Sequence, residues 1–138
     1  MRKYNLIGQD GNAYAIMGYV RKALLDEGFS KDSVREYLGE AMSGDYFNLI
    51  SVSFDWLAQA NGKFLEIDTE KDARRFLEWL KGVVGSGFHP DDDLREYEDE
   101  DGCRLFSEDE AAELQVALDA CFDVCEDNGV DIYSLCNN

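Results

Sequence analysis

Carboxylates are the side chains in this sequence most able to do chemistry, and most of them are gathered in its last third. Residues 91–131 contain seventeen Asp and Glu against two Arg, whereas the rest of the chain contains thirteen acids and eleven bases. This segment therefore carries a net charge of −15, out of −17 for the whole chain. Such a concentration could bind a divalent cation, attract a basic protein or form a solvated surface. It repels nucleic acid and anionic membrane, so neither is an expected direct partner.

Calcium is the first cation to consider, because carboxylate oxygens are the ligands it prefers. If Gly102 is aligned with the glycine of an EF-hand loop, Asp99, Asp101 and Glu108 fall at ligand positions. Tyr97 then takes the first position, where a carboxylate is needed. We therefore expect no EF-hand, no metal site and no cofactor. Divalent-cation binding by the aspartates of 91–101 remains an alternative, through Asp91, Asp92, Asp93, Asp99 and Asp101.

Catalytic patterns are weak. His89 is the only histidine that could activate a thiol, and no GxxxxGK[ST] or GxGxxG phosphate loop occurs. Cys121 and Cys125 lie four apart on a predicted helix, which separates their Cβ atoms by about 5–6 Å. A disulfide needs about 3.5–4.5 Å, so we expect reduced thiols in the core. The chain is not expected to be an enzyme.

The last predicted helix carries the clearest signal. Ser107 and Glu110 form a capping box that begins it, and it extends to about Asn128. At about 100° per residue, an apolar stripe lies opposite an acidic stripe that no Lys or Arg interrupts. Acids near its C-terminus oppose the helix dipole, which favours a surface with a function. The predicted partner-binding residues are Asp99, Asp101, Glu108, Asp109, Glu113, Asp119, Asp123, Glu126 and Asp127.

Helical periodicity dominates the elements that must position these side chains. Ser30 and Thr69, the latter with Asp72, are predicted N-caps, and Gly28 is a predicted helix end. The sequence predicts a mainly α, single-domain bundle of about five helices over residues 1–138. Residues 1–60 form a three-helix N-terminal cluster, 61–87 the fourth helix region, and 88–138 an acidic loop with an amphipathic C-terminal helix. Residues 61–68 interrupt the helical pattern and are read as extended. Asp101-Gly102 predicts a short β-ribbon over 96–106. A small β element there, at 63–67 or at the N-terminus would make the alternative fold class α+β.

Several stretches of the chain resemble small uncharacterised acidic proteins of gut bacteria, their phages and mobile elements. The resemblance lies in YNLIGQDGNAYAIMGYV, SGDYFNLI, GFHPDDDLREYEDEDGCRLFSEDEAAEL and CEDNGVDIYSL. In the tail module of these proteins, a G-F-H-P-D turn leads to a short ribbon and a helix. The resemblance implies no established activity. A mobile-element setting would favour an anti-defence or regulatory role.

The leading hypothesis is a non-enzymatic cytoplasmic binding protein that presents an acidic surface to a basic partner, such as a nucleic-acid-binding protein. Duplex DNA carries one charge per about 1.7 Å, so fifteen charges match about 25 Å of duplex and permit mimicry of nucleic acid. The sequence shows neither a secretory signal nor a membrane span, and this favours the cytoplasm. Two alternatives stay open: cation binding, and a structural homodimer through exposed Trp56 or Trp79. The oligomeric state is not predicted.

Overall fold

The computed structural model describes residues 2–136, and this part of the chain is mainly α-helical, as predicted. Contacts cluster the chain into two compact units, an N-terminal unit (Arg2–Lys63) and a C-terminal unit that begins at Phe64. The single domain over residues 1–138 stays a prediction. The helices of the described residues are α1 (Ala13–Asp26), α2 (Lys31–Ala41), α3 (Tyr46–Phe64), α4 (Glu70–Val84), the 3-10 helix η1 (Leu94–Glu96), α5 (Glu108–Asp127) and α6 (Ile132–Cys136).

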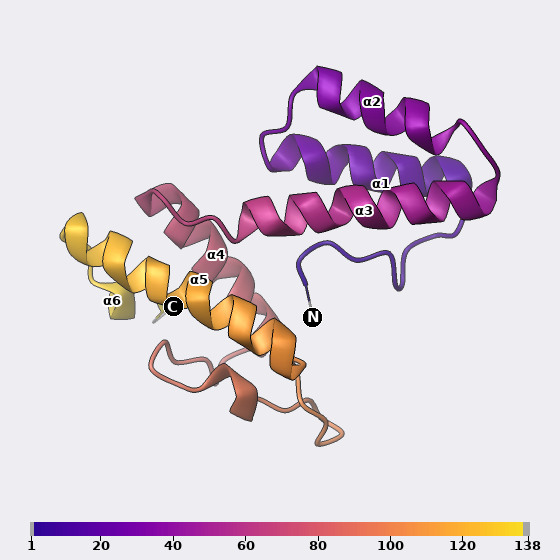
Figure 1. Ribbon diagram of the computed structural model, residues 1–138. Coiled ribbons are helices and arrows are strands. Elements are labelled where there is room, and N and C mark those ends of the chain that lie inside the picture. The colour runs from indigo at the N-terminus through magenta and orange to yellow at the C-terminus, as the bar shows by residue number, and fades with distance from the viewer. Residues whose placement is uncertain (1, 137–138) are drawn as a thin grey trace. The chain divides into compact units, whose positions relative to one another are not determined.

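In the N-terminal unit, α1, α2 and α3 lie alongside one another (Figure 1). Ser30 caps α2 as predicted, because its side chain accepts a hydrogen bond from the backbone N–H of Ser33 at 3.1 Å. Gly28 ends α1 with φ +84°, a conformation that glycine adopts without steric cost. Its N–H and that of Phe29 donate to the carbonyls of Leu25 and Leu24, which is a Schellman motif. The sharp reversal brings α2 back against α1.

Helix α3 is longer than the sequence predicts. Residues 61–64 were expected to be extended, but they continue the helix through Gly62 to Phe64. A glycine inside a helix costs about 1 kcal/mol relative to alanine. Phe64 is buried, and its ring lies 6.0 Å from that of Phe76 and 5.5 Å from that of Trp79. The packing of the Phe64 ring therefore outweighs the unfavourable helix propensity of Gly62.

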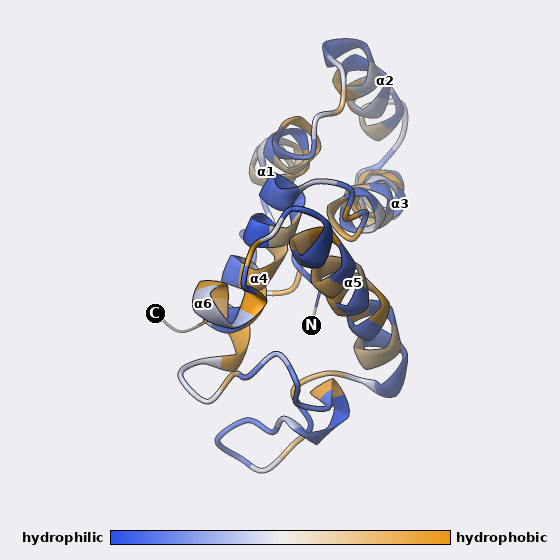
Figure 2. Cartoon of the chain, turned by 90° about the vertical axis from the view of Figure 1, so that its left-hand side faces the viewer, coloured by the Kyte–Doolittle hydropathy of each residue, from blue (hydrophilic) through white to orange (hydrophobic). Residues whose placement is uncertain are grey.

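The C-terminal unit is built around α4, which packs against α5 and α6. Thr69 and Asp72 begin α4 with a capping box, as predicted. Hydrophilic and hydrophobic residues alternate along α5 in Figure 2, as expected for an amphipathic helix. Its buried side faces α4, and η1 also contacts α5. Among the described residues, no helix has both the length and the apolar character needed to cross a membrane.

The predicted β-ribbon at 96–106 is not present as strands. A single antiparallel bridge joins Glu98 and Arg104, next to a hydrogen bond of 2.8 Å from the N–H of Asp99 to the carbonyl of Cys103. The turn itself is where the sequence placed it, with Gly102 at φ +81°. The pairing stops after one bridge because η1 ends at Glu96 and the N-cap of α5 follows at Ser107. The described part of the chain is therefore α rather than α+β.

Candidate acidic interaction face

The orientation of α5 is fixed by its cap and its buried stripe. Ser107 Oγ accepts from the N–H of Glu110 at 3.2 Å, and Glu110 Oε1 accepts from the N–H of Ser107 at 3.0 Å. The predicted apolar stripe of this helix consists of Leu114, Leu118, Cys121, Phe122 and Cys125. All of them are buried except Phe122, which is half-buried. The opposite side of the helix must therefore face outward.

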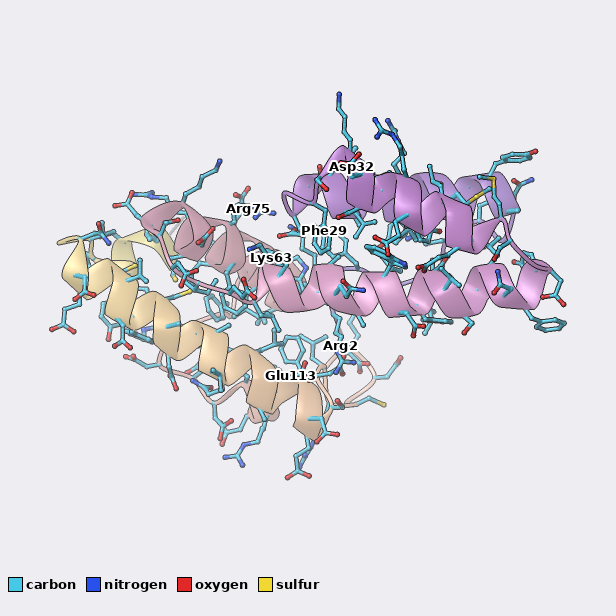
Figure 3. The ribbon with its side chains drawn as sticks, turned by 45° about the horizontal axis from the view of Figure 1, so that its top comes forward. Arg2, Phe29, Asp32, Lys63, Arg75 and Glu113 are labelled. Atoms are coloured by element: carbon cyan, nitrogen blue, oxygen red, sulfur yellow. The ribbon has the colours of Figure 1, made fainter. Side chains whose placement is uncertain are left out.

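All nine predicted partner-binding residues are exposed. Asp99 and Asp101 lie in the turn before α5, and Glu113 is labelled on α5 in Figure 3. No Lys or Arg occurs in α5. Their exposure is a finding, whereas their role in binding stays a prediction. We call the seven exposed acids of α5 the acidic face: Glu108, Asp109, Glu113, Asp119, Asp123, Glu126 and Asp127.

The acidic face consists of two clusters rather than one continuous stripe. Asp119 follows Glu113 by six positions, which is about 9 Å along the helix axis. Val116, which is 71% exposed, occupies the outer surface between the clusters. The sequence prediction of an acidic stripe passed over this apolar interval. We name the two parts the first cluster (Glu108, Asp109 and Glu113) and the second cluster (Asp119, Asp123, Glu126 and Asp127).

The clusters differ in their relation to the helix. The first begins in the N-terminal turn of α5, where carboxylates interact favourably with the helix dipole. The second lies towards the C-terminus, where they oppose it, and the last turn contains no basic residue. Asp119, Asp123 and Asp127 also repeat every four residues, which places like charges next to one another. The amide of Gln115 donates to Asp119 at 3.1 Å. Apart from this hydrogen bond, the charges of the second cluster oppose their own helix, whereas those of the first cluster favour it.

The aspartates of the loop before α5 take part in local hydrogen bonds. Asp93 caps η1 and binds Arg95, with 2.8 Å between the Arg95 Nη2 and Asp93 Oδ2 atoms. These hydrogen bonds from Arg95 lower the pKa of Asp93 to about 2. Asp99 accepts from the N–H groups of Asp101 and Cys103, at 2.9 and 3.0 Å. The turn at Gly102 depends on this carboxylate.

Two tyrosines hold the first two aspartates of the loop. Tyr133 of α6 donates to Asp91, and Tyr97 donates to Asp92 at 2.8 Å. Burial, together with the neighbouring Asp92, raises the pKa of Tyr97 to about 12. His89 also belongs to this local network, since its Nδ1 accepts from the backbone N–H of Asp91 at 3.2 Å. The sequence does not reveal these contacts, because partners five and 42 positions away leave no periodic spacing pattern.

A divalent-cation site would need several carboxylates of the loop to converge on one point. Within residues 2–136, no three His, Cys, Asp or Glu side chains are arranged so that they could hold a metal ion. Asp91, Asp92, Asp93 and Asp99 each accept hydrogen bonds from different groups instead of converging on one point. The cation alternative stays a prediction for metal titration to test.

The cysteines and tryptophans serve the core. Cys121 and Cys125 are free and buried, as predicted, and burial raises the pKa of Cys121 to about 12. Trp56 is only 8% exposed, and its indole N–H donates to Glu40 at 2.9 Å. Trp79 is half-buried against Phe64. The prediction that Trp56 is exposed and available to a homodimer interface is therefore wrong. Trp79 is only partly exposed.

Comparison with known proteins gives no match to a family model, a curated protein or a solved structure. Function is therefore inferred from the residues of this chain.

Proposed function

We propose that this chain is a non-enzymatic binding protein that presents the acidic face to a basic protein, in the manner of a nucleic-acid backbone. The observation that carries the proposal is the second cluster. Its carboxylates are exposed on a helix that they destabilise through the dipole and through mutual repulsion. A surface needed only for solubility could have mixed Lys with Glu and avoided both costs.

The charge density of α5 supports mimicry of a single strand. Twenty residues make a helix about 30 Å long. Seven exposed acids over this length give one charge per about 4 Å, compared with one per about 3.4 Å along each strand of duplex DNA. A site in a basic protein that recognises phosphates would meet a comparable number of carboxylates, divided between the two clusters.

The charge is also concentrated in one unit. From Phe64 onward the chain contains 22 acids and six bases, a net charge of −16, whereas Arg2–Lys63 contains eight acids and seven bases, a net charge of −1. A field of this strength attracts basic surfaces and repels nucleic acid. Together with the resemblance to proteins of mobile elements, it favours a cytoplasmic anti-defence or regulatory role, in which the partner is a nucleic-acid-binding protein.

Capture from a host lysate tests the proposal. The immobilised chain should retain a basic nucleic-acid-binding protein at about 0.05 M salt and release it at about 0.5 M, because screening weakens such contacts. Duplex DNA added at low salt should also release the protein, which separates mimicry from general attraction to acids. Retention that neither salt nor DNA disturbs would contradict the proposal.

The variant Asp119→Lys/Asp123→Lys/Asp127→Lys should abolish retention. Its matched control is Asp26→Lys/Glu36→Lys/Asp55→Lys, which makes the same change in net charge at exposed positions of the N-terminal unit. The control should retain the partner. Equal losses in the two variants would show that net charge alone, and not the second cluster, determines capture.

A further inference from the structure

The N-terminal unit contains an apolar pocket of about 270 Å³. None of its lining residues belongs to the acidic face. The pocket is lined by residues from all three helices: Ala13 and Met17 of α1, Ala41 and Met42 at the end of α2, and Tyr46 and Leu49 of α3. Its volume falls just below the range of about 300–1,000 Å³ that is usual for sites of drug-sized ligands. The space suits one large side chain better than a small molecule.

The walls of this pocket are held in place before anything binds. The hydroxyl of Tyr46 donates to the carbonyl of Gly11 at 2.6 Å, which fixes the ring at the pocket. The amide of Asn48 donates to the carbonyl of Glu40 at 2.9 Å and so ties the start of α3 to the end of α2. Gly44 leaves no room for a Cβ, which would lie 2.9 Å from that of Asn48. A preformed pocket loses little conformational entropy when it is filled.

Large apolar side chains around the pocket are left open to solvent. Met42, in its wall, is 64% exposed, and Phe47, which follows Tyr46 in α3, is 81% exposed. Tyr14, which follows Ala13 in α1, is 82% exposed. Large exposed apolar side chains mark interaction sites when they form a patch, and Met, Tyr and Phe are enriched at protein interfaces.

The charged side chains at the pocket favour a ligand of opposite charge. The pocket lining includes one charged side chain, Asp45, and no Lys or Arg. Asp10 and Glu40, which precede Gly11 and the wall residue Ala41 in the sequence, are exposed as well. A second copy of the chain would bring these acids against one another, and like charges across an interface are unfavourable. A basic segment would be attracted instead.

We propose that this pocket binds one large apolar side chain of a basic polypeptide segment, whose flanking Lys or Arg residues face Asp10, Glu40 and Asp45. The site is separate from the acidic face and does not depend on it. Burial of the side chain supplies the affinity, and the acids select the charge of the segment.

Three labelled synthetic peptides test the proposal by fluorescence anisotropy with the full chain. The first has a central Phe flanked by Lys, the second replaces Phe with Ala, and the third replaces Lys with Glu. The Lys peptide with Phe should bind at least about tenfold more tightly than the Ala peptide, because burying a Phe favours binding by that order. It should also bind more tightly than the Glu peptide, because the acids at the pocket repel Glu. On binding, the methyl NMR signals of Met17 and Met42 should shift.

Met42→Lys changes an exposed side chain and should abolish the preference for Phe over Ala. Val116→Lys is the matched control, since it places the same charge at an exposed apolar position in the other unit, and it should keep the preference. Asp119→Lys/Asp123→Lys/Asp127→Lys should keep it as well, which separates this site from the acidic face. Equal binding of Phe and Ala peptides, equal binding of the Glu peptide, or unshifted Met17 and Met42 signals would overturn the proposal. A dimer in solution that Met42→Lys converts into a monomer would overturn it too, because the occupant would then be a second copy.

Discussion

The hydroxyl of Tyr133 donates to both carboxylate oxygens of Asp91, at 3.0 and 3.2 Å, although 42 residues separate them in the chain. Its ring also lies 5.9 Å from that of His89 and 6.3 Å from that of Phe122. A short C-terminal helix therefore holds the beginning of the acidic loop against α5. The conformation of this loop depends on α6 as much as on its own residues.

Tyr133→Phe should lower the urea midpoint of unfolding, because it removes a hydrogen bond to a charged acceptor. Urea denaturation of the full chain measures the change. Tyr14→Phe, on the strongly exposed Tyr14, should stay within about 0.5 kcal/mol of the wild type. Equal effects of the two substitutions would show that the contact with Asp91 does not stabilise the unit.

Local signals in the sequence were sufficient for the helices. Ser30, Thr69 and Ser107 are N-caps where the patterns placed them, and Gly28 ends α1. The outward direction of the acids on α5 also followed from periodicity, because the buried Leu114 and Leu118 fix the opposite side. These features depend on residues three or four apart, which a sequence displays directly.

Features that depend on distant residues were missed. Phe64 extends α3 because it packs on α4, and nothing in residues 61–64 shows that contact. The acids of the loop looked like a ligand set, but Asp91 is bound by Tyr133 from the end of the chain. Trp56 was read as exposed, although Tyr37 packs against it with ring centroids 6.2 Å apart. Spacing alone does not reveal such partners.

The four cysteines should differ sharply in reactivity towards a thiol reagent such as a disulfide-exchanging dye. Cys103 is exposed and should react at once, whereas the other three are buried. Burial also raises the pKa of each of these three thiols, that of Cys121 to about 12, so few reactive thiolates form. The native chain should show one fast thiol and the unfolded chain four. Cys103→Ser should remove the fast reaction, and a second fast thiol in that variant would contradict the packing of α5 and α6.

Tyr97 should ionise late in an alkaline titration. Burial raises its folded-state pKa to about 12, above the ordinary value of about 10. The stabilisation that it provides is therefore fully present below pH 10 and is lost as the pH rises towards 12. Ultraviolet absorbance should show a tyrosinate transition near pH 12 that Tyr97→Phe removes. Asp92→Asn should move this transition to lower pH, because the carboxylate beside the hydroxyl raises the pKa as well. An unchanged transition in both variants would contradict the contacts of this loop.

Neutralising the second cluster should make the protein more stable. Asp119→Asn/Asp123→Asn/Asp127→Asn removes two like-charge pairs at four-residue spacing and one charge beside the C-terminus of α5. Together these changes should raise the free energy of unfolding by about 1 kcal/mol, or the melting temperature by a few degrees. The gain should shrink at high salt, where charge repulsion is screened.

The first cluster gives the matched control for this experiment. Glu108→Gln/Asp109→Asn removes charges that favour the N-terminus of α5 and should lower stability by a few tenths of a kcal/mol or more. A stabilised Asn variant that also loses the captured partner would show that the second cluster reduces stability in return for binding, as functional surfaces commonly do. If neutralisation instead destabilised the chain, these carboxylates would serve the fold, and their surplus charge would no longer support a role in recognition.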